Sequence, residues 1–163
     1  MLSVQKMKIN NSINIGIVGL GYVGLPLAIE FSKYFSVVGY DINKLRIDQL
    51  IKFKDATGEV NSNKLKKLNK NNIYFTASHT NLRNCNIFII TVPTPINKRF
   101  KPDLRYIKSA TRTVSSYLKA GNIVIYESTV YPGTTEEICA PLLERLSGLK
   151  FNKEFFCGFS PER

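Results

Sequence analysis

Three glycines follow the first strongly apolar run of this 163-residue chain, in the pattern Gly-x-Gly-x-x-Gly. They are Gly19, Gly21 and Gly24 of the stretch GLGYVG, which opens a segment of helical periodicity. In such a pattern the first glycine permits a tight turn, the second lets backbone amides approach a pyrophosphate, and the third lets a helix pack on a strand. Because the N-terminus of that helix would face the phosphates, the motif predicts a dinucleotide site, with an ordinary glycine turn as the alternative.

An acidic residue lies where a dinucleotide site needs one. Asp41 ends the second apolar run, 20 residues after Gly21, and a carboxylate there can accept hydrogen bonds from both ribose hydroxyls of an adenosine. This position favours NAD, because a 2′-phosphate would bring a second negative charge to the carboxylate. Arg46 leaves an alternative open, since its guanidinium could hold a 2′-phosphate or stack on adenine.

Two later motifs carry hydroxyl side chains. TVPTP, at 91–95, ends the fourth apolar run, and YESTVYPGTT, at 126–135, lies at the end of the fifth. The hydroxyls of Thr94, Ser128 and Thr129 would then stand at the carboxyl edge of the sheet, where open α/β sheets bind ligands. The plainer interpretation of the first motif is a strand terminator.

Short apolar runs alternate with helical segments along the whole chain. The runs predict six strands, at 13–19, 36–41, 72–77, 86–92, 122–128 and 154–160. Helices are expected at 22–34, 43–53, 102–121 and 133–148, with a short surface helix within 54–70. Since each helix carries the chain back across the sheet, neighbouring strands must be parallel. We expect an α/β fold: a doubly wound (Rossmann) parallel sheet of about six strands with helices on both faces.

The formal net charge of +11 raises nucleic acid as a partner. The densest basic cluster, at 61–72, mixes Lys with Asn and has neither Arg nor an aromatic residue, which is typical of a solvated face. A diffuse positive field attracts any anion, including a nucleotide diphosphate. We therefore expect no nucleic-acid partner.

A membrane span and a metal site are not expected either. The solidly nonpolar stretch at 15–29 is shorter than the roughly 20 residues that a span needs, and it contains four Gly and one Pro. Cys85, Cys139 and Cys157 form no C-x-x-C pair, so neither a disulfide framework nor a zinc site is predicted. Three such thiols fit a reducing cytoplasm.

Four motifs occur in a fixed order: IGIVGLGYVGLPLA, VPTPI with KPDL, ESTVYPGTT and SPER. With them the chain resembles the NAD-binding half of the UDP-glucose and GDP-mannose dehydrogenase family. GLPLA and VPTPI are most similar to its bacterial branch that oxidises UDP-N-acetylhexosamines for surface polysaccharides. The resemblance covers residues 13–163 and leaves 1–12 as an N-terminal tail. It implies oxidation of carbon 6 of a nucleotide sugar from alcohol to acid, with two NAD and a covalent cysteine thioester.

The resemblance also implies roles for individual residues. Cofactor contacts would fall on Tyr22, Val23, Asp41, Arg46, Thr94 and Thr129. Thr129 and Glu162 match positions beside the reacting carbon, where they would order water and move protons. Arg163 matches a position that faces the substrate, and its guanidinium suits a sugar-nucleotide phosphate.

Other parts of the family pattern lie beyond the SPER motif: its cysteine, its catalytic Lys and Asn, the dimer-forming central helix and a second nucleotide-binding domain. Cys85, Cys139 and Cys157 precede a predicted strand, lie in a helix and lie in a strand, so we expect inert packing residues. We therefore expect this chain alone to be inactive, and the full-length enzyme to be a homodimer or larger that acts on a UDP-sugar. A non-catalytic nucleotide-binding fragment and a different NAD-dependent dehydrogenase on the same fold are the alternatives.

Overall fold

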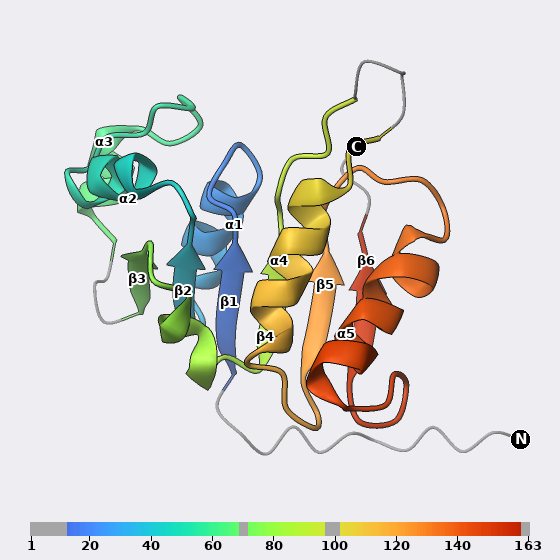
Figure 1. The fold of residues 1–163 in the computed structure, drawn as a ribbon. Coiled ribbons are helices and arrows are strands. Elements are labelled where there is room, and N and C mark those ends of the chain that lie inside the picture. Colours follow the sequence, from blue (N-terminus) through green and yellow to red (C-terminus); the bar gives the residue numbers. More distant parts are fainter. Residues whose placement is uncertain (1–12, 69–71, 97–101, 161–163) are drawn as a thin grey trace, which may run out of the picture.

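Six parallel strands form one sheet in the computed structural model, which describes residues 13–68, 72–96 and 102–160. The strand order is β3-β2-β1-β4-β5-β6 (Figure 1). Their bounds are β1 Asn14–Val18, β2 Ser36–Tyr40, β3 Ile73–Thr76, β4 Ile87–Ile90, β5 Ile123–Tyr126 and β6 Phe156–Phe159. The chain builds one half of the sheet outward from β1, then returns to the other side of β1 with β4. The expected doubly wound sheet of six strands is confirmed, and the order reverses between β1 and β4.

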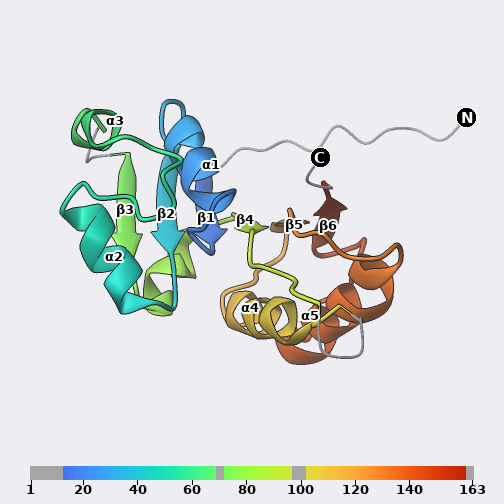
Figure 2. The same cartoon turned by 90° about the horizontal axis from the view of Figure 1, so that it is seen from above.

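Helices cover both faces of this sheet. They are α1 Gly24–Phe31, α2 Lys44–Ile51, α3 Ser62–Lys66, the 3₁₀-helix η1 His79–Asn84, α4 Arg105–Ser115, the π-helix η2 Thr134–Cys139 and α5 Ala140–Ser147. Seen from above, α1 lies on one side of the sheet and α4 and α5 lie on the other (Figure 2). The short helix expected within 54–70 is α3. No helix among the described residues has the length and apolar character of a membrane span.

The sheet separates two apolar layers. On one face α1 and α2 pack against the strands, with Ile17 and Leu25 fully buried. On the other face α4 and α5 cover β4 and β5, and Phe88 and Tyr126 are fully buried there. Each such side chain stabilises the fold by about 2 kcal/mol relative to exposure. The two layers therefore fix the carboxyl ends of β1, β2, β4 and β5 relative to one another.

The helix expected at 102–121 is shorter than predicted, because α4 runs only from Arg105 to Ser115. Asp103 lies in the turn before the helix and accepts a hydrogen bond from the backbone N–H of the first helical residue at 3.0 Å. At the other end the Ser115 hydroxyl donates to the Arg112 carbonyl at 2.7 Å and competes with the helical hydrogen bonds.

The helix expected at 133–148 is divided into η2 and α5. Gly133 precedes η2 with a positive φ of 88°, a conformation that glycine adopts without steric cost. Helical periodicity in the sequence predicts that this segment is helical, but it does not separate a π-turn from an α-turn.

Candidate functional site

The turn from β1 into α1 holds the glycine motif at the carboxyl edge of the sheet. Gly19 has a φ of 100°, and its backbone N–H donates to the Tyr40 carbonyl at 2.8 Å. Its own carbonyl accepts a 2.7 Å hydrogen bond from the Thr91 hydroxyl. A Cβ on Gly24 would overlap both this carbonyl oxygen and the Thr91 hydroxyl oxygen. Gly24 is thus required by the close approach of α1 to the turn.

Gly21, in contrast to Gly24, has free space beside it. A Cβ built on it meets no protein atom within 4 Å, so this side of the turn is open. Within the described residues, the backbone N–H groups of Tyr22 and Val23 donate to no protein acceptor. Free amides at the start of a helix, beside a position without a side chain, form a site for an anion such as a pyrophosphate. The side chain of Tyr22 points away from the core and is 67% exposed.

Asp41 joins the end of β2 to this turn. One carboxylate oxygen, Oδ2, accepts from the Leu20 backbone N–H at 2.8 Å, and Oδ1 accepts from the Asn43 backbone N–H at the same distance. Each carboxylate oxygen can accept more than one hydrogen bond, so both keep capacity for hydroxyl donors. The side chain is half-buried beside the glycine turn, where the sequence predicted the ribose.

Arg46 lies beneath the same turn. Its Nε donates to the Leu20 carbonyl at 2.8 Å, and the residue is only 7% exposed. Its Nη1 lies 2.7 Å from Oδ1 of Asp55, in a buried ion pair. The guanidinium therefore holds the turn from inside the protein. The direct cofactor contact that the family resemblance implies stays a prediction.

Asp55 is a residue of this site that the sequence did not indicate. Its side chain is fully buried and accepts from the Thr57 backbone N–H at 3.0 Å, the Thr57 hydroxyl at 2.7 Å and the Val60 backbone N–H at 2.9 Å. Burial alone would raise the pKa of Asp55, but these donors and the Arg46 guanidinium outweigh it and lower the pKa to about 2. No motif surrounds this carboxylate, and only its spacing from a basic residue in the preceding helix could have suggested a pair.

The loops that follow β4 and β5 are tied together by two side-chain hydrogen bonds. The Thr94 hydroxyl donates to the Thr129 carbonyl, and the Ser128 hydroxyl donates to the Val92 carbonyl at 2.7 Å. Ser128 is 3% exposed, so its hydroxyl organises the loops from inside, whereas Thr129 is exposed. Figure 1 shows the carboxyl ends of β1, β4 and β5 at one end of the sheet. The structure thus brings the glycine turn, Asp41, Thr94 and Thr129 to the same edge.

Two expected residues are not part of this arrangement. Glu162 and Arg163, expected beside the reacting carbon and the substrate, lie outside the described residues. Among the residues that are described, no three His, Cys, Asp or Glu side chains come together in a way that could hold a metal ion.

The three cysteines are free thiols. Burial raises the pKa of Cys85 to about 11 and that of Cys157 to about 12, and it also raises the pKa of Cys139. A thiol attacks as its thiolate, so at neutral pH none of the three is an activated nucleophile. The expectation of packing residues agrees with these environments.

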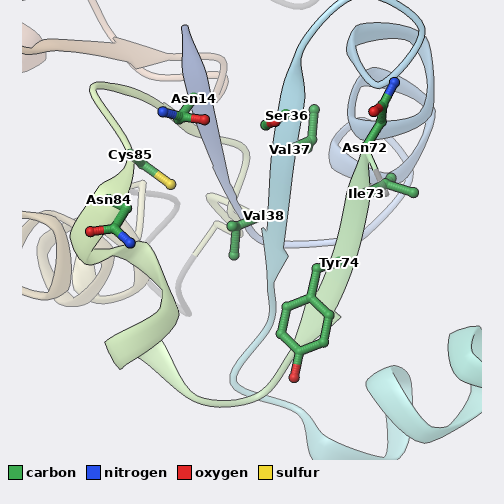
Figure 3. Close-up of a pocket in the computed structure, with 9 residues that line it drawn as sticks. All are labelled: Asn14, Ser36, Val37, Val38, Asn72, Ile73, Tyr74, Asn84 and Cys85. Atoms are coloured by element: carbon green, nitrogen blue, oxygen red, sulfur yellow. The ribbon is translucent and has the colours of Figure 1, made fainter. Parts of the chain in front are cut away.

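A cavity of about 180 Å³ lies at the opposite edge of the sheet (Figure 3). Its lining residues include Asn14 and Ser36 at the starts of β1 and β2, and Cys85 before β4. No charged side chain of the described residues lines it. This cavity therefore offers no cationic side chain to an anion, and none of its lining residues belongs to the glycine turn.

The chain is similar in sequence to a known family of dehydrogenases. The family model described as "UDP-glucose/GDP-mannose dehydrogenase family, NAD binding domain" matches residues 13–163. The UDP-N-acetyl-D-glucosamine 6-dehydrogenase of Pseudomonas aeruginosa is 52% identical over 151 residues, which make up 93% of this chain and 35% of that protein.

Two solved structures have the same arrangement of strands and helices. The UDP-D-ManNAc dehydrogenase of Pyrococcus horikoshii superposes with a TM-score of 0.86 at 38% identity and covers 93% of this chain and 36% of that one. A ternary complex of GDP-mannose dehydrogenase from Pseudomonas aeruginosa gives a TM-score of 0.83 at 29% identity, with 91% and 36% covered. The chain spans about a third of the length of the relatives that it matches.

Proposed function

The chain belongs to the UDP-glucose/GDP-mannose dehydrogenase family and comprises its NAD-binding domain, and from this premise we propose that it supplies the cofactor site of an enzyme that oxidises carbon 6 of a UDP-N-acetylhexosamine. The observation that carries the proposal is the open backbone at Gly21, flanked by free amides and by the Asp41 carboxylate. The substrate class follows from the 52% identity to a UDP-N-acetyl-D-glucosamine 6-dehydrogenase.

The residues at the carboxyl edge of the sheet suit successive parts of an NAD molecule. The pyrophosphate would lie over Gly21 and accept from the amides of Tyr22 and Val23. Asp41 would accept hydrogen bonds from both hydroxyls of the adenosine ribose, and the loop that contains Thr94 would contact the rest of the cofactor. When bound, NAD supplies the hydride acceptor of the reaction.

Other members of the proposed site act around this core. Gly19 and Gly24 shape the turn, Arg46 holds it through the Leu20 carbonyl, and Ser128 fixes the β5 loop. We propose that Thr129 contacts the cofactor and also lies beside the reacting carbon. By family resemblance Glu162 would move protons there and Arg163 would bind the substrate's phosphates.

The complete protein would carry the rest of the chemistry. Oxidation of an alcohol to an acid removes two hydrides. A cysteine thiol would add to the intermediate aldehyde as a thiohemiacetal, which loses the second hydride and a proton to give a thioester that water hydrolyses to the acid and the free thiol. Each thiol of this chain has a raised pKa, so the nucleophile would come from the remaining two thirds of the protein. We propose a homodimer or larger assembly, located in the cytoplasm, for that complete enzyme.

The proposal is tested by NADH absorbance. A form that contains this domain and the remaining two thirds is mixed with NAD and UDP-N-acetylglucosamine, UDP-N-acetylgalactosamine or UDP-glucose. Two NADH per uronic acid, fastest with an N-acetylated sugar, are expected, and the 163-residue chain alone should form none. NADH from a hydroxy acid and not from any UDP-sugar would favour a different dehydrogenase on this fold, and NAD binding without any turnover would favour a non-catalytic module.

A further inference from the structure

The Arg46 guanidinium has donor capacity that the protein does not use. Of its five N–H donors, Nε bonds to the Leu20 carbonyl. Nη1 is in ion-pair contact with Asp55 but outside hydrogen-bond geometry, and neither it nor Nη2 has a hydrogen-bonded acceptor among the described residues. A buried cation with unused donors would bind an anion strongly if it could reach one.

Such an anion would come close to this guanidinium in one kind of cofactor. Arg46 and Asp41 both bond to the backbone of Leu20. Arg46 donates to the Leu20 carbonyl, and Asp41 accepts from the Leu20 N–H. Asp41 is the proposed ribose ligand, and the guanidinium bonds to the same residue, Leu20, that Asp41 bonds to. NADP differs from NAD by a phosphate at that position.

Asp55 keeps the guanidinium in place. Its own carboxylate is fixed by the Thr57 hydroxyl and by the backbone N–H groups of Thr57 and Val60. The ion pair therefore links Arg46 to the segment between α2 and α3. Among the described residues, Asp55 is the only acidic side chain paired with Arg46.

We propose that Asp55 is a positioning residue for cofactor selection: it retains the Arg46 guanidinium beneath the glycine turn and so prevents this cation from binding a 2′-phosphate. The site then presents only the Asp41 carboxylate to the 2′ position and selects NAD. This inference rests on the proposed NAD site. It assigns the selectivity to a residue that does not touch the cofactor.

The test compares dissociation constants of NAD and NADP for the 163-residue chain by calorimetry. In Asp55→Asn, which keeps the shape and removes the charge, the ratio of the NADP constant to the NAD constant should fall about tenfold, the effect of one added charge-assisted hydrogen bond. The double variant Asp55→Asn with Arg46→Met should have the ratio of Arg46→Met alone. Equal weakening of both cofactors by Asp55→Asn would overturn the proposal, because a purely structural role predicts no change of the ratio.

A milder variant covers the case in which Asp55→Asn does not fold. Thr57→Val removes the hydroxyl that bonds to Asp55 at 2.7 Å but leaves the backbone N–H bond, so the ratio should fall about twofold. Thr113→Val is the matched control, since that hydroxyl bonds to the Ser109 carbonyl on α4 and should leave the ratio unchanged. An unchanged ratio in folded Thr57→Val would equally overturn the proposal.

The two proposals fail in different ways. If the wild-type chain binds neither cofactor, the proposed NAD site is wrong. If it binds NAD more tightly than NADP and the ratio does not respond to Asp55, the NAD site stands and the role of Asp55 is wrong.

Discussion

Gly21 and Gly24 stand three residues apart and are required for opposite reasons. At Gly24 a side chain would collide with the Gly19 carbonyl and the Thr91 hydroxyl, so the fold itself excludes it. At Gly21 the space is empty, so only a ligand would exclude a side chain. Substitutions at these two positions can therefore test the stability of the turn and its proposed binding role separately.

Gly21→Val should bind no detectable NAD and change stability by less than about 1 kcal/mol. Gly24→Ala should lower stability by at least about 3 kcal/mol, because the overlapping atom is backbone that cannot move aside freely. Circular dichroism with urea titration measures stability, and calorimetry measures NAD binding. A folded Gly21→Val variant with wild-type NAD affinity would contradict the phosphate site.

The pKa of Asp55 predicts an acid-sensitive contribution to stability. Its folded pKa of about 2 is below the ordinary 3.8, so the contribution is fully present above pH 4 and is lost as the pH falls through 2. The difference amounts to about 2 kcal/mol. Urea titrations between pH 5 and pH 2 should show a smaller decline for Asp55→Asn than for wild type. Identical declines would show that the carboxylate is not stabilised in the folded state.

The sequence indicated the residues of the site that follow a spacing rule. The three glycines and Asp41 have fixed positions in a strand, turn, helix and strand, so the pattern alone placed them correctly at one edge. The Arg46–Asp55 pair depends on how the segment after α2 turns back, and no local pattern encodes that. The pair forms only in the tertiary structure.

Side-chain hydroxyl groups form hydrogen bonds that join the ends of three strands, β1, β4 and β5, at the proposed site. Thr91 joins β4 to the glycine turn, and Ser128 joins β5 to the end of β4. These bonds satisfy partly buried carbonyls in a region where the chain leaves the sheet. The loops are thus linked to one another along the edge where we propose the dinucleotide site.

Ser128→Ala tests this coupling. The change leaves the Val92 carbonyl without its donor and should lower stability by about 1 kcal/mol, a fall in Tm of about 2–4 °C. Thr113→Val, which removes a hydroxyl bond on the outer part of α4, should change Tm by less than half as much. Equal Tm values for Ser128→Ala and wild type would indicate that the bond does not hold the loops.

The existence and type of the elements could be predicted because alternating apolar runs and helical segments leave few arrangements. Their ends could not. α4 stops at Ser115, where a side-chain hydroxyl competes for the backbone, and the segment before α5 winds as a π-helix. Both effects depend on local hydrogen-bond geometry, which the residue pattern does not specify.

In the whole molecule, two helical layers hold six strand ends so that the proposed nucleotide site lies at one edge and an uncharged cavity lies at the opposite edge. The cavity at the amino ends of β1–β3 lacks charged lining residues, whereas the other edge carries the open turn, free amides and Asp41. The division agrees with the general rule for doubly wound sheets. The chain should therefore bind the cofactor without the rest of a complete enzyme.

Calorimetric titration of the purified 163-residue chain with NAD tests this central claim most directly. We predict saturable binding of one NAD per chain, tighter than that of NADP, with the preference narrowed in Asp41→Ala because its carboxylate no longer opposes a 2′-phosphate. A chain that circular dichroism shows to be folded and that binds neither cofactor, or binds both equally well, would contradict an NAD-selective site in this domain.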